Sequence, residues 1–82
     1  MLKVIAEQEH YLLISDGPHY TVVERRAGKF YPLCTGTRHG YELDDGAGAE
    51  LMRRSGSYSE KDAHRLLSQV ASHWRELFER VR

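Results

Sequence analysis

The residues in this chain that could perform nucleophilic catalysis are a thiol and an imidazole five positions apart, Cys34 and His39. A cysteine nucleophile needs a base within hydrogen-bond reach and a third group that orients this base, a role open to Asp44 or Asp45. Nothing nearby except Arg38 would activate the thiol, and a free cysteine is more often a small buried apolar side chain. We therefore expect a protein that is not an enzyme.

Five histidines and an acidic, glycine-rich segment raise the question of a metal site. His64 and His73 lie nine residues apart in a predicted helix, about half a turn out of phase, so they do not share one ion. The other three histidines show none of the paired spacings that zinc sites use. The segment 44–50 lacks the spacing of calcium ligands and the lysine of a phosphate-binding loop. The sequence therefore predicts no metal and no cofactor.

Three basic residues, Arg25, Arg26 and Lys29, surround the tip of a predicted hairpin. Such side chains could contact DNA phosphates while the strands enter a groove. Acidic residues such as Glu24 and Glu42 interleave with them, and the chain has 12 basic and 12 acidic residues, so its formal net charge is zero. A nucleic-acid-binding protein normally carries a clear basic footprint. DNA binding through these three residues is therefore the alternative function.

The element with the strongest pattern is the last third of the chain, 59–82, which has the periodicity of one long amphipathic helix. Ser59 can cap its first turn, and Asp62 can reach back to the cap. A helix with one apolar face needs a surface on which to pack, because ordering its backbone costs about 1–2 kcal/mol per residue. The apolar residues recur every three or four positions and form one stripe, which contains Ala63, Leu66, Leu67, Val70, Ala71, Trp74, Leu77, Phe78 and Val81.

The first half of the chain has the composition of short strands separated by turn residues. Its β-prone runs are 2–6, 11–15, 20–26 and 29–34. All strands are expected within 2–43, and the segment 44–57 is either irregular or a short helix. We predict a single α+β domain over residues 1–82. It contains an antiparallel β-meander of three to five strands, covered on one face by the long C-terminal helix.

Both faces of the predicted strands are apolar, although one helix covers only one face of a sheet. An exposed apolar face of this size is typical of a contact with a second copy or with another protein. Alternatively, strand twist and the segment 41–54 bury this face within the chain. The candidate interface residues belong to one strand parity and are Tyr11, Leu13, Tyr20, Val22 and Phe30.

These patterns favour a small non-enzymatic protein-binding module that self-associates as a homodimer or acts as an accessory or inhibitory subunit. Cys34 is the only cysteine, so no intrachain disulfide forms, which favours a reducing, cytoplasmic location. No run approaches 18 apolar residues, so we expect no membrane span. No motif is specific enough to indicate a family.

Overall fold

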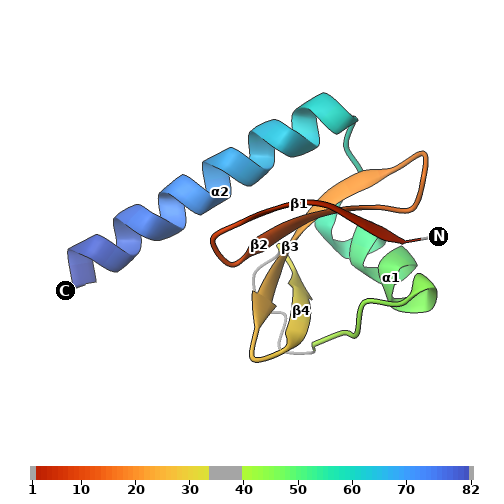
Figure 1. The fold of residues 1–82 in the computed structure, drawn as a ribbon, viewed down its shortest axis with the longest axis horizontal. Coiled ribbons are helices and arrows are strands. Elements are labelled where there is room, and N and C mark those ends of the chain that lie inside the picture. Colours follow the sequence, from red (N-terminus) through yellow and green to blue (C-terminus); the bar gives the residue numbers. More distant parts are fainter. Residues whose placement is uncertain (1, 34–39, 82) are drawn as a thin grey trace.

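The computed structural model describes the backbone of residues 2–33 and 40–81, and the side chains of these residues except 45 and 74–81. Four strands are followed by two helices, and the strands form one antiparallel sheet (Figure 1). The predicted α+β class and the antiparallel sheet are therefore confirmed. Over the same part of the chain, neither helix combines the length and apolar character needed to cross a membrane.

The sheet is a meander in which each strand pairs with its neighbour in the sequence. The strands are β1 (Lys3–Gln8), β2 (Tyr11–Ser15), β3 (Tyr20–Arg26) and β4 (Lys29–Pro32). The β3–β4 turn has positive φ at both central residues, 50° at Ala27 and 79° at Gly28. Two such residues twist a hairpin in the sense that strands prefer, so this short turn fixes the β3–β4 register.

Helix α1 (Asp45–Ser55) occupies the segment that the sequence left open between an irregular chain and a short helix. Asp44 caps its start, because the Oδ1 atom accepts a hydrogen bond of 2.7 Å from the Ala47 N–H. Gly56 ends the helix with a φ of 92°, and its N–H donates to the Met52 carbonyl at 2.9 Å. A glycine with positive φ satisfies the last carbonyls at little steric cost.

Helix α2 (Glu60–Val81) begins where the sequence predicts. The Ser59 hydroxyl accepts a hydrogen bond of 3.2 Å from the Asp62 N–H, so the predicted cap is present. Just before it, the Tyr58 N–H donates to the Tyr20 carbonyl at 2.8 Å. This single bridge fixes the connector between the helices to the start of β3.

The two helices pack against opposite faces of the sheet, because successive residues of each strand point to opposite sides. The α2 side forms one core from Tyr11, Leu13, Val22, Ala63, Leu67 and Ala71. The α1 side forms a second core from Leu12, Ile14, Val23, Leu51 and Met52. The sheet therefore separates two cores, one shared with α1 and one shared with the first half of α2.

The exposed apolar face expected from the sequence is not found among the described residues, because α1 covers it. The alternative interpretation of the segment 41–54 therefore describes the structure better. The second cover was missed because only Leu51 and Met52 supply large buried side chains in a helix that starts with glycines and alanines. The predicted packing of Trp74 and of the stripe beyond it concerns side chains outside the described ones.

Candidate interaction surface at the sheet edge

The two edges of the sheet differ, and the edge at β4 is covered. Phe30 and Tyr41 form a bridge in which each backbone N–H donates to the other carbonyl at 2.9 Å. Beside it, the Lys29 ammonium pairs with the Glu42 carboxylate. This short crossing of the chain occupies backbone groups that β4 would otherwise present to solvent.

The edge at β1 is open along the part of the chain that the structure describes, because β1 is the last strand in the order and pairs only with β2. The Val4 side chain is 50% exposed and that of Ile5 is 41% exposed. Both are far more exposed than the buried apolar side chains of β2 and β3. Backbone N–H and C=O groups of alternate residues point outward from such an edge. We call Lys3–Gln8 with these outward groups the β1 edge.

A β-bulge interrupts the β1 edge. Val4 pairs with Ile14, whereas the next pair joins Ala6 with Leu13, so Ile5 is the extra residue. Bulges bend and twist an edge strand, which limits uncontrolled pairing with other chains. The β1 edge therefore presents a short pairing surface of defined shape.

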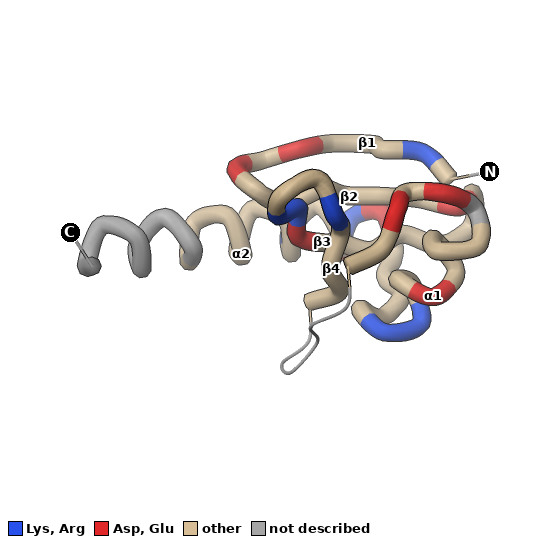
Figure 2. Tube along the Cα trace, turned by 90° about the horizontal axis from the view of Figure 1, so that it is seen from below, with Lys and Arg blue, Asp and Glu red and all other residues tan. Residues whose placement is uncertain are grey.

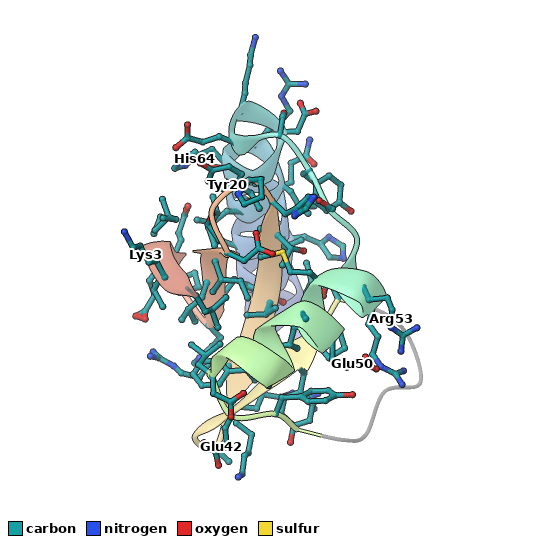
Figure 3. The ribbon with its side chains drawn as sticks, turned by 90° about the vertical axis from the view of Figure 1, so that its right-hand side faces the viewer. Lys3, Tyr20, Glu42, Glu50, Arg53 and His64 are labelled. Atoms are coloured by element: carbon teal, nitrogen blue, oxygen red, sulfur yellow. The ribbon has the colours of Figure 1, made fainter. Side chains whose placement is uncertain are left out.

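A shallow hollow of about 340 Å³ lies next to the β1 edge. The Ser15–Tyr20 loop that borders it is fixed by its own hydrogen bonds, because the Gly17 N–H donates to the Ser15 hydroxyl at 3.1 Å and the His19 N–H to the Asp16 carboxylate at 3.0 Å. In Figure 3, Lys3 lies beside β1, on the side away from Glu50 and Arg53 of α1. The hollow is lined by Lys3, Ile5, Ser15, Asp16, Gly17 and Tyr20.

The five residues expected at the interface do not form one exposed surface. Tyr11, Leu13 and Val22 are buried in the core beneath α2, and Tyr20 packs against that core. Phe30 packs against the other core, beneath α1. The two residues of β2 and the two of β3 do share one face, because Leu13 pairs with Val22 and Ser15 with Tyr20, but α2 packs on that face. Phe30 lies on the other face, because the register from β3 to β4 could not be read from the sequence. These residues serve the two cores and leave the edge as the candidate surface.

The three residues of the DNA-binding alternative each have an acidic or aromatic neighbour. The Arg25 guanidinium lies 3.0 Å from the Glu7 carboxylate, and that of Arg26 lies 3.0 Å from the Glu24 carboxylate and 4.0 Å from the centre of the Tyr31 ring. Figure 2 shows basic and acidic segments close together around β3 and β4. Lys29 pairs with Glu42. Phosphate binding would compete with these carboxylates, so the hairpin lacks the surplus of positive charge that DNA binding requires.

The candidate catalytic pair, Cys34 and His39, lies outside the described residues. Within the described ranges, no three histidine, cysteine or acidic residues are grouped as metal ligands. His10, His19 and His64 are exposed at the surface.

The pKa shifts in this molecule have structural causes. Burial, with a smaller contribution from the Glu24 carboxylate, raises the pKa of the Tyr11 phenol. The hydrogen bond to Glu42 raises the pKa of Lys29, and hydrogen bonds from Arg53 and Arg54 lower the pKa of Glu50. The last two shifts belong to surface ion pairs and the first to a core residue. They therefore do not mark a site where protons would be exchanged with a substrate.

Sequence reasoning missed Val4 and Ile5 as surface residues. The run 2–6 is β-prone, but its composition alone does not say where the strand lies in the sheet. A meander places its first strand at an edge by construction, so this signal was available once the meander was predicted.

Comparison with protein-family models gives no match for this chain. No curated protein matches it. No solved structure matches it either. The edges, faces and charges of the molecule therefore carry the information about its function.

Proposed function

We propose that this chain is a small non-enzymatic protein-binding module that binds an extended segment by adding it as a strand to the β1 edge. In this role it acts as a homodimer or as an accessory or inhibitory subunit. The observation that supports the proposal is the contrast between the two edges: Tyr41 pairs with β4, whereas β1 has a strand neighbour on one side only within the described ranges 2–33 and 40–81. Main-chain hydrogen bonds supply affinity in strand addition, and side-chain contacts supply specificity.

The side chains on β1 suit this mode of binding. Val4 and Ile5 expose apolar surface at an edge whose backbone groups need partners. Complete burial of a side chain of this size is worth about 1.5–3 kcal/mol, of which these half-exposed side chains have about half still to gain, and cross-strand pairs add roughly 0.2–1 kcal/mol each. The hollow beside Ile5 offers space for a side chain from the added strand.

The helical cover of the sheet is also part of the proposal. We propose that α2 acts as the long cover of one face, supported by Ala63, Leu67 and Ala71, which share a buried core with Leu13. This cover leaves the edge, and not the face, as the place where a partner binds. A cytoplasmic location stays a proposal supported by cysteine usage alone.

The proposal is tested by capture from an extract of the native cell. The wild-type chain, immobilised through its C-terminus, is compared with Val4→Lys and Ile5→Lys, and the captured proteins are identified by mass spectrometry. We expect the wild-type chain to capture another protein or a second copy of itself, and we expect both edge variants to fail to capture it. Ser68→Lys on the exposed surface of α2 is the matched control and should retain it. Identical capture by the wild type and both edge variants would contradict the proposal.

A further inference from the structure

We infer that the segment bound at the β1 edge is the β1 strand of a second copy of this chain, paired antiparallel across a twofold axis. This inference rests on the proposed function, because it names the partner of the same edge. It would join the two four-stranded sheets into one continuous sheet of eight strands.

Charge distribution along β1 favours an antiparallel pair of copies. Lys3 stands at the start of the strand and Glu7 near its end, and both side chains are exposed. Antiparallel alignment keeps the two lysines at opposite ends of the contact, while the Glu7 carboxylate of each copy stays paired with Arg25 of its own chain at 3.0 Å. Parallel alignment would place lysine beside lysine and glutamate beside glutamate, which destabilises a strand pair.

The difference between the sheet edges limits this assembly to two chains. Each copy offers the β1 edge, whereas its β4 edge is occupied by the Phe30–Tyr41 bridge. Pairing of two β1 edges therefore uses both open edges and leaves covered ones outside. An interface of identical surfaces closes as a twofold dimer and does not grow into a filament.

The bulge fixes the register of the pair. Residues directly opposite each other in a sheet point to the same face. Lys3 and Gln8 pair with Ser15 and Tyr11, which share one face, whereas Val4 pairs with Ile14 on the other face.

Glu7 shares the face of Val4, because it pairs with Leu12. A face-matched antiparallel pair that uses the whole length of β1 therefore places Lys3 of each copy opposite Gln8 of the other, and Val4 opposite Glu7. The twofold axis then passes between Ile5 and Ala6. The two copies contribute these two apolar side chains to the centre of the contact, and the polar residues lie at its ends.

Disulfide trapping tests this register. In a Cys34→Ser background, Lys3→Cys and Gln8→Cys chains are mixed and oxidised mildly, and the products are weighed by mass spectrometry. We expect the mixed disulfide between the two variants. Each variant alone should cross-link poorly, because five residues of strand separate identical positions by roughly 17 Å, whereas a disulfide needs Cα atoms about 4.4–6.8 Å apart.

Ser68→Cys on α2 is the control and should not cross-link. Efficient cross-linking of Lys3→Cys with itself would indicate a parallel pair and overturn the register. Equal yields of all three products would indicate random collision and overturn the interface.

Sedimentation velocity separates failure of this inference from failure of the proposed function. We expect a dimer at micromolar concentration that Ile5→Lys converts to a monomer, with an unchanged far-ultraviolet circular dichroism spectrum that shows the variant is folded. A monomeric wild type that still captures another protein through Val4 and Ile5 would overturn the second copy as partner and support strand addition. A monomeric wild type with no edge-dependent capture would overturn both.

Discussion

Leu12 and Leu13 are neighbours in β2, yet their side chains lie in two different cores. Leu12 is 3% exposed and packs in the core beneath α1, whereas Leu13 is fully buried in the core beneath α2. β2, one of the two inner strands, thus contributes consecutive residues to both cores. The packing of both helices depends on this strand. The sheet separates the side chains of one core from those of the other.

Double-mutant cycles should separate the two cores. Leu13→Ala and Leu67→Ala are each expected to lower the free energy of unfolding by about 2–5 kcal/mol, as buried leucine truncations do. Because both residues lie in one core, we expect a coupling energy of about 0.5–3 kcal/mol between them. The matched pair, Leu13 with Leu51, should be additive within about 0.5 kcal/mol. Urea denaturation measures the coupling energy of each pair. Equal coupling energies in the two cycles would contradict the assignment of Leu13 and Leu51 to separate cores.

The cap of α1 gives a test with a conservative control. Asp44→Ala removes the oxygen that accepts from the Ala47 N–H and should cost about 1 kcal/mol of stability. Asp44→Asn keeps an acceptor oxygen at the same place and should cost clearly less. Thermal unfolding followed by circular dichroism measures the difference. If alanine and asparagine have the same effect, the carboxylate does not act as a cap.

Thr21 provides a prediction of increased stability. Its side chain is fully buried, and within the described residues its Oγ1 atom has no hydrogen-bond partner. A buried hydroxyl without a partner costs roughly 1–3 kcal/mol. Thr21→Val has a similar shape and should raise the free energy of unfolding by about 1 kcal/mol. Thr21→Ser keeps the hydroxyl and loses a methyl group, so it should destabilise; a destabilised valine variant would show that the hydroxyl is satisfied.

The ion pairs of Glu50 should make the stability of the fold decrease at acidic pH. Arg53 donates to both carboxylate oxygens at 2.6 and 3.1 Å, and Arg54 donates at 2.7 Å. These bonds, with those from Arg53 the larger, hold the pKa of Glu50 below its ordinary value of 4.5. Because the pKa of Glu50 is lower in the folded state, its ion pairs contribute fully to the stability of the fold above pH 4.5. This contribution is lost as the pH falls through the pKa of Glu50 in the folded state.

Carbon-detected NMR titration of the Glu50 carboxylate measures this shift. Arg53→Gln should raise the titration midpoint toward the ordinary value, and Arg54→Gln should raise it less. A midpoint that neither variant changes would mean that the pairs do not persist in solution.

The sequence predicted the elements with repeated local signals and missed those whose role depends on register. The β3–β4 turn was recognisable from Ala27 and Gly28 because a two-residue hairpin carries its geometry in its own residues. The start of α2 was recognisable from Ser59 for the same reason. The sequence does not distinguish helix α1 from an irregular segment because its apolar pattern is short, although Asp44 and Gly56 mark its two ends.

The candidate site was harder to predict because it depends on which strand is unpaired. Tyr11, Leu13 and Val22 carried the strongest apolar signal, and a strong apolar signal is what a buried core also produces. The informative residues were Val4 and Ile5, whose apolar side chains were unremarkable in the sequence. Only the order of the strands and the bridge at Tyr41 distinguish an exposed apolar pair from a buried one.

The nearest-neighbour order of the strands has a consequence for how quickly the chain reaches its native state. Every strand pairing joins segments separated by a turn of only a few residues, so little chain entropy is lost before contacts form. Chains dominated by such local pairings fold faster than those that join distant segments. We expect the hairpins to form early and the two helices to dock afterwards. In that sequence of events the N-terminal strand is accessible from the first moments of folding.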